Sequence, residues 1–301
     1  YLLYLFGCVG TGDWLAMGIV TVTQAALLAL TLWGIARSFL KIATATGSVK
    51  KVRFEHKAVR AQSAQRALFG KELCRFTASP NYMLNCGLGI LMLPVAGVVL
   101  LIKGGALGQL LEDVFGANAG VVPVLMCAAV CLLASMNDMA APSVSLEGKS
   151  LWLAQSLPVV PWQVLRAKLD VQLVLTGAPV LFCALCMVIV LPGGALEKVL
   201  TVVVALLYTL LSALAALAFG LKMPNLTWTN EITPIKQSGC VMLSLFANWF
   251  YAIALGGLYF LCGRYLSAAA YLALAAAITA TVCALLLRWV KQRGTRIFAA
   301  L

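Results

Sequence analysis

Three consecutive residues, Gly148, Lys149 and Ser150, match the end of a phosphate-binding loop. Such a loop needs the pattern G-x-x-x-x-G-K-[ST] after a β-strand, because consecutive backbone N–H groups then wrap the phosphates at a helix N-terminus. Ser143 stands where the first glycine is required, and the chain reaches it from an apolar segment with the length of a helix. We therefore expect this tripeptide to serve another purpose than nucleotide binding.

Other catalytic patterns are missing from the sequence. His56 is the only histidine, and neither H-E-x-x-H nor G-x-S-x-G occurs. Cys183 and Cys186 form a C-x-x-C pair, but no histidine lies near them and the residues around them are apolar, which favours two small apolar side chains over a redox or metal pair. The sequence predicts no catalytic residue and no metal ligand.

The elements that carry these residues are strongly apolar. Of the 301 residues, 62% are hydrophobic and 11% are charged, whereas about 25% are charged in soluble domains. A helix of about 20 residues crosses the hydrocarbon core of a bilayer. Seven charge-free stretches reach that length: 14–36, 81–102, 114–137, 171–196, 199–221, 237–263 and 265–287.

These stretches predict an all-α, polytopic membrane protein with seven complete transmembrane helices. The apolar residues 1–10 read as the end of an eighth helix. We therefore expect residues 1–36 to be the end of an upstream transmembrane region, with one complete span at 14–36, and the whole polypeptide to be longer.

Basic residues indicate the orientation. Nineteen of the 22 Lys and Arg residues fall in four segments that alternate spans would place on one side: 37–75, 138–170, 222–236 and 288–301. Loops rich in Lys and Arg stay on the cytoplasmic side. We expect this side, with the C-terminus, to be cytoplasmic. Orientation and anionic lipid headgroups explain the net charge of +12 without a nucleic-acid partner.

The chain divides near residue 65. Residues 37–64 read as a basic cytoplasmic linker, and 65–301 as a domain of six membrane helices. The domain is expected to begin with an amphipathic helix at 65–80 in the membrane interface; its apolar stripe is Phe69, Leu73 and Phe76. The six helices are expected at 81–102, 119–136, 171–192, 199–220, 239–262 and 265–288.

The segment 137–170 is expected to be a cytoplasmic loop between the second and third of these helices. Its second part predicts a short separate helix that starts at Pro161 and carries Trp162, Leu165 and Leu169 on one face. An exposed apolar face on such a helix contacts either the lipid surface or a partner protein.

Asn248 lies near the middle of one expected span. An unpaired amide is costly in lipid, so its side chain should face the bundle interior. There it either forms an interhelical hydrogen bond or lines a substrate path. None of the seven stretches contains an ionisable Asp, Glu, Lys, Arg or His, which argues against an ion-coupled carrier.

Three segments carry a resemblance to a known family: GKELCRFTASPNYMLNCGLGI (70–90), SVSLEGKSLWLAQSLPVVPWQVLRAKL (143–169) and PNLTWTNEITPIKQS (224–238). With the six-helix layout, they make residues 65–301 resemble the permease subunit of type-2 ABC exporters. The resemblance is greatest to a bacterial family of ABC exporter permeases best known in Gram-positive species.

The resemblance implies a permease of the bacterial plasma membrane that binds no cofactor itself. A separate ATPase subunit would bind ATP and Mg on the cytoplasmic face, and a second permease half or a second copy of this chain would complete the transporter. In such permeases the loop after the second helix docks on the ATPase. Carried onto this chain, the coupling role falls on Glu147, Gly148, Lys149, Trp152, Trp162, Leu165 and Leu169.

Two other classes of function stay open. The chain could be an ATP-independent channel or secondary transporter, or a membrane assembly factor without transport activity. No residue of the sequence points to a particular substrate.

Overall fold

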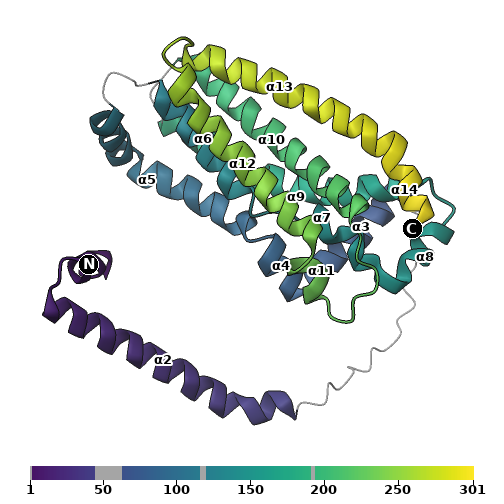
Figure 1. Ribbon diagram of the computed structural model, residues 1–301, viewed down its shortest axis with the longest axis horizontal. Helices are drawn as coiled ribbons and strands as arrows, with labels where there is room; N and C mark the ends of the chain where they lie inside the picture. The colour runs from purple at the N-terminus through teal and green to yellow at the C-terminus, as the bar shows by residue number, and fades with distance from the viewer. Residues whose placement is uncertain (1, 45–62, 116–119, 191–193) are drawn as a thin grey trace. The chain divides into compact units, whose positions relative to one another are not determined.

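The structure is a computed structural model that describes residues 2–44, 63–115, 120–190 and 194–301 (Figure 1). It divides into two compact units, residues 1–60 and 61–301. In the first unit, α1 (Leu2–Gly10) and α2 (Trp14–Ala43) are joined by a turn. Asp13 caps α2, because its Oδ1 accepts a hydrogen bond of 2.9 Å from the N–H of Leu15. The predicted linker lies mostly outside the described residues.

The second unit contains the remaining helices. In chain order they are α3 (Ala64–Ala78), α4 (Pro80–Cys86), α5 (Gly89–Phe115), α6 (Val121–Ala134), α7 (Ala140–Ser143), the 3-10 turn η1 (Ser145–Ser150), α8 (Leu151–Ser156), α9 (Pro161–Val190), α10 (Ala195–Lys222), α11 (Ile232–Lys236), α12 (Gly239–Cys262), α13 (Ala268–Trp289), the π-turn η2 (Val290–Gly294) and α14 (Thr295–Ala300). Helix α10 packs against α9, α12 and α13, which run alongside it, and the short helices α3, α8 and α14 gather near one end (Figure 1).

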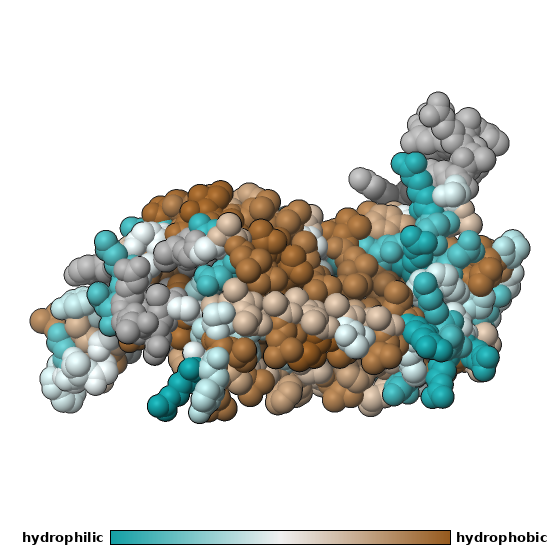
Figure 2. Space-filling model, turned by 90° about the horizontal axis from the view of Figure 1, so that it is seen from above, coloured by the Kyte–Doolittle hydropathy of each residue, from teal (hydrophilic) through white to brown (hydrophobic). Residues whose placement is uncertain are grey.

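Six helical segments of the described chain are long and apolar enough to cross a membrane: Trp14–Phe39, Gly89–Gln109, Pro161–Val190, Ala195–Lys222, Ile232–Cys262 and Ala268–Ala300. On the face shown in Figure 2, hydrophobic side chains cover the middle, and hydrophilic ones are most frequent at one end and fewer at the other. The stretch 114–137 is shorter as a helix than predicted. Helix α6 has 14 residues and rises about 21 Å, less than the roughly 30 Å of a hydrocarbon core.

Two breaks between consecutive helices contact each other inside the second unit, one between α4 and α5 and one between α6 and α7. The first break shows that the predicted span 81–102 is not a single helix. Helix α4 ends at Cys86 and α5 begins at Gly89. Between them Gly87 pairs with Asn137, and the N–H of Asp138 donates to the carbonyl of Cys86 at 3.1 Å. A side chain on Gly89 would lie 2.7 Å from Asn137 Oδ1. Gly87, Gly89 and Asn137 are buried, and irregular backbone is tolerated within a helical bundle where protein surrounds it.

The first part of the predicted loop 137–170 is interior, and most of 149–163 is exposed or half-buried. Residues 137–148 are buried apart from a few accessible atoms. The prediction of a separate helix from Pro161 is wrong, because α9 runs without a break to Val190. Leu165 and Leu169 are 0% and 4% exposed and face the core instead of a surface. Neither Gly nor Pro stands at the expected boundary, so nothing in the local sequence ends the helix there.

Helix α3 packs against α9 instead of presenting an apolar face to lipid alone. Its fully buried residues are Leu68, Glu72 and Phe76, whereas Phe69 and Leu73 are half-buried. The buried stripe therefore shares Phe76 with the predicted one, but it contains Leu68 and Glu72 in place of Phe69 and Leu73. This arrangement brings a carboxylate, Glu72, into the interior, and this requires a positive partner.

Candidate functional site

Five charged side chains meet where α3, η1 and α9 come together: Lys71, Glu72, Arg75, Glu147 and Lys168. We call them the ion cluster. The Lys168 side chain is fully buried. Its Nζ lies 2.7 Å from Glu147 Oε1, 2.9 Å from Glu72 Oε1 and 3.0 Å from the carbonyl oxygen of Ser143. An ammonium group has three donors, so each finds an acceptor.

Glu147 is the centre of the ion cluster. In addition to Lys168, its Oε1 accepts from Lys71 Nζ at 2.9 Å and its Oε2 accepts from Arg75 Nη2 at 2.7 Å. Burial alone would raise the pKa of Glu147, but Lys168, Arg75 and Lys71 together hold it well below its usual range. Glu147 is therefore ionised at neutral pH, and it connects η1 to both neighbouring helices.

Gly148 follows with a backbone conformation that favours glycine. Its φ is 50° and its ψ is −133°. A Cβ at this position would lie 3.1 Å from Trp228 Nε1. That indole nitrogen donates a hydrogen bond of 2.6 Å to the carbonyl of Ser145, and the N–H of Asn225 donates to Ser145 Oγ at 3.0 Å. The glycine that suggested a phosphate loop thus lets the connection before α11 pack onto η1.

The predicted coupling residues fall into two groups, one buried and one at least partly exposed. Glu147, Gly148, Leu165 and Leu169 are buried, so they offer no side chain for direct contact with a partner in this conformation. Lys149 is exposed, Trp152 is 66% exposed, and Trp162 is half-buried with Lys291 Nζ 5.1 Å from its ring centre.

Exposed apolar side chains continue from Trp152 along α8 and the connection after it. With Lys149 they form what we call the α8 patch: Lys149, Trp152, Leu153, Leu157 and Val160. Sequence analysis missed Leu153, Leu157 and Val160, because an apolar residue in an apolar chain gives no signal of exposure.

Asp138 is a buried carboxyl group that sequence analysis also missed. It stands one residue beyond the charge-free stretch 114–137 and so read as a loop residue. Its side chain lies in the interior, where Ser244 Oγ donates to Oδ1 at 3.1 Å, while Oδ2 has no hydrogen-bond partner among the described residues. Burial raises the pKa of Asp138 to about 7. The interior of the second unit therefore contains an ionisable group just beyond one of the charge-free stretches.

Asp138 also lines a hollow of about 370 Å³. Ser135, Lys236 and Trp249 line it with Asp138, and the other walls are mainly apolar. The residue thus borders a hollow, although its side chain is buried.

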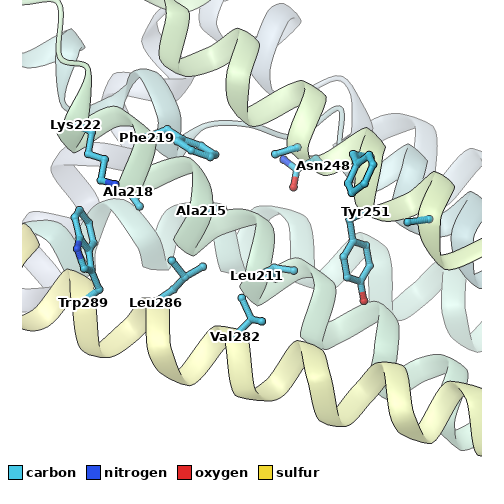
Figure 3. A pocket seen from close by; sticks show the side chains of 13 residues that line it. Leu211, Ala215, Ala218, Phe219, Lys222, Asn248, Tyr251, Val282, Leu286 and Trp289 are labelled. Atoms are coloured by element: carbon cyan, nitrogen blue, oxygen red, sulfur yellow. The ribbon is translucent and has the colours of Figure 1, made fainter.

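Asn248 lines a different hollow, a groove of about 470 Å³ between α10, α12 and α13 (Figure 3). Its Nδ2 is buried and has no hydrogen-bond partner among the described residues. The expected interhelical hydrogen bond is thus not formed by this donor, and the residue borders the groove. Lys222 and Trp289 lie at the other end of the groove, with Lys222 Nζ 5.2 Å from the Trp289 ring centre.

The remaining candidates for chemistry are not assembled into a site in the part of the chain that is described. Cys183 and Cys186 are buried free thiols on α9. No group of three or more His, Cys, Asp and Glu side chains that could hold a metal ion occurs among the described residues. His56 lies outside them.

Neither a family model nor a curated protein nor a solved structure matches the chain.

Proposed function

We propose that the chain is the membrane-spanning permease subunit of an ABC exporter of the bacterial plasma membrane. It would move its substrate with the energy of ATP, bound with Mg and hydrolysed by a separate ATPase subunit. The observation that carries the proposal is the α8 patch, where exposed apolar side chains stand beside Lys149. Exposed apolar surface bordered by polar residues marks an interaction site.

The connection between this patch and the bundle supports the proposal. The patch follows directly after Glu147, which the ion cluster joins to Lys168 on α9. From Lys168, α9 continues to Val190, a rise of about 33 Å. A partner that displaces the patch must therefore move a membrane helix, because a close-packed interior transmits displacement. A second contact, from Gln155 Nε2 to the carbonyl of Phe298 at 2.9 Å, ties α8 to the C-terminal helix.

Co-purification with an ABC ATPase encoded beside this chain tests the proposal. We expect the complex to form, and replacement of both Lys149 and Trp152 by Ala to remove most of it. Tyr265→Ala is the matched control, because Tyr265 is 85% exposed between α12 and α13, away from the α8 patch. Equal recovery of ATPase with both variants would show that the patch is not the docking surface. Binding of the purified chain to lipid vesicles through the patch, with no ATPase recovered, would favour the lipid-surface alternative.

The buried carboxyl group of Asp138 favours one second candidate, a secondary transporter coupled to protons. Ionisable groups buried among membrane helices mark ion pathways in carriers. Flux driven by a pH gradient in vesicles that contain the chain but no ATPase, and lost in Asp138→Asn, would establish this candidate. Flux that requires the ATPase and ATP would establish the first.

A further inference from the structure

We propose that the groove between α10, α12 and α13 binds a single-chain anionic amphiphile. Its anionic group would contact Lys222, its apolar body would fill the groove, and an oxygen acceptor near its far end would receive a hydrogen bond from Asn248. The binding site does not depend on the ATPase. That the ligand is also the cargo would rest on the proposed function.

The walls of the groove are complementary to an apolar body. Thirteen described residues line it, and they are mainly small or apolar: Leu211, Ala215, Ala218, Phe219, Lys222, Ala247, Asn248, Phe250, Tyr251, Ala254, Val282, Leu286 and Trp289. Four of the lining residues are alanines, and their small side chains leave room between the larger side chains of the groove. The volume of about 470 Å³ is within the roughly 300–1,000 Å³ typical of ligand pockets.

The length of the groove matches one leaflet of a bilayer. On α10 it runs from Leu211 to Lys222, the last residue of that helix. Eleven helical steps rise about 16 Å, roughly half of the 30 Å hydrocarbon core. A chain whose head lies at the membrane surface would thus reach about the middle of the bilayer.

The positive charge of Lys222, at the end of the groove that we place at the membrane surface, favours an anionic head group on the ligand. Lys222 is exposed and is the one charged side chain among the described lining residues, none of which is acidic. Stacking of its ammonium group over Trp289 holds the cation beside the groove. An anionic group there gains an ion pair, whereas a cationic head would be repelled.

The other end of the groove, where Asn248 lies, favours a ligand with a hydrogen-bond acceptor. Figure 3 shows Asn248 and Tyr251 away from Lys222. The Tyr251 hydroxyl is already paired with Thr279 at 2.7 Å, but Asn248 Nδ2 has no partner among the described residues. A saturated hydrocarbon would leave this donor unpaired, which is unfavourable in an apolar environment. Nδ2 itself is closed to solvent in this conformation, so an oxygen at that depth would satisfy it once the amide turns toward the groove.

Photoaffinity labelling of the purified chain in nanodiscs tests the proposal. The probe is stearate with a diazirine, and the adducts are mapped by peptide mass spectrometry. Competition with unlabelled stearate, with stearate bearing a mid-chain keto group, and with stearyl alcohol gives relative affinities. We expect adducts within 247–254 and 282–289, stronger competition by the keto acid than by stearate, and weaker competition by the alcohol.

Two variants separate the contacts. Lys222→Gln should weaken competition by the acids about three- to tenfold, the scale of one lysine at an anionic headgroup. Lys291→Gln is the matched control, because Lys291 also lies over a tryptophan ring, that of Trp162, outside the groove. Asn248→Leu should remove the preference for the keto acid while stearate still binds. Thermal melting of each variant confirms that it is folded.

Several outcomes would overturn the proposal. These are adducts spread evenly over all exposed apolar faces, equal effects of Lys222→Gln and Lys291→Gln, and equal competition by acid and alcohol. Cross-linking of a second copy of the chain into the groove, unaffected by the acids, would also overturn it. Each of these results is independent of ATPase docking, so the proposed function stands or fails separately.

Discussion

Replacing Glu147 by Gln is expected to lower the free energy of unfolding by about 3–5 kcal/mol, the cost of breaking a buried ion pair by removing one partner. The Lys168 side chain has no exposed surface, and Glu147 Oε1 lies 2.7 Å from its ammonium nitrogen. Glutamine keeps the size of the side chain but removes its charge. The ion cluster would then hold three cations against Glu72 alone, with Lys168 unable to reach water.

The loss of stability should not depend on pH near neutrality. The three cations hold the pKa of Glu147 below its usual range, so its stabilising effect is fully present above the unfolded pKa of about 4.3. It is lost only as the pH falls through the lower folded value. Thermal unfolding in detergent at pH 6 and pH 8 measures this, with a thiol-reactive fluorophore as the reporter, because seven described cysteines are buried.

A surface ion pair on the same helix provides the control. Arg166 Nε lies 3.6 Å from Asp170 Oδ2, and the Arg166 side chain is 56% exposed, so Arg166→Gln should cost about 0–1 kcal/mol. The double variant Glu147→Gln with Lys168→Met should be less destabilised than the sum of the single variants, because it removes both buried charges. Equal destabilisation by Glu147→Gln and Arg166→Gln, or strict additivity in the double variant, would refute the buried coupling of Glu147 with Lys168.

Two further predictions use the same melting assay. Gly148→Ala should destabilise the fold by about 1–3 kcal/mol, because its φ of 50° strains any other residue and the new methyl group would meet Trp228; Gly70→Ala, at a helical glycine with open space around its Cβ position, is the control that should not destabilise. For Asp138, the pKa raised to about 7 means that the folded state retains a proton which the unfolded state releases near pH 4. Stability of the wild-type protein should therefore fall by up to roughly 4 kcal/mol between pH 4 and 7, and Asp138→Asn should abolish this slope; a wild-type stability that rises over this interval would contradict the raised pKa of the buried carboxyl group.

Hydropathy predicted the helical membrane class and several helix bounds well. The expected helix 239–262 coincides with α12, since Gly263 and Arg264 follow an unbroken apolar run. The same reasoning failed at 81–102, where α4 and α5 are separate helices. Gly87 and Gly89 do not by themselves reveal a break; the close approach of Asn137 does, and no local pattern of the sequence contains it.

The coupling segment was located by resemblance, but its organisation depends on contacts between distant residues. Gly148 could be singled out for its type, yet its role follows from Trp228, eighty residues later in the chain. The direction of Asn248 toward a helix interface was a sound prediction from the cost of an amide in lipid. That its donor has no partner among the described residues required the positions of α10 and α13.

Charges misled the sequence analysis most, because each was treated as a mark of solvent. Lys168 was assigned to a cytoplasmic helix on this basis, although its charge is matched by Glu72 and Glu147 from two other elements. A lysine that is paired with carboxylates can be buried, because the ion pairs and hydrogen bonds replace its contacts with water. The position of the helix then follows from the apolar residues on either side of the lysine. Asp170, which bounds the predicted span at 171, is likewise only partly exposed and is paired with Arg166 and Gln65. A charge at that position therefore does not end the helix, which extends back to Pro161. In a basic membrane protein with few acidic residues, each Glu in an apolar context is therefore the better guide to which cations are interior.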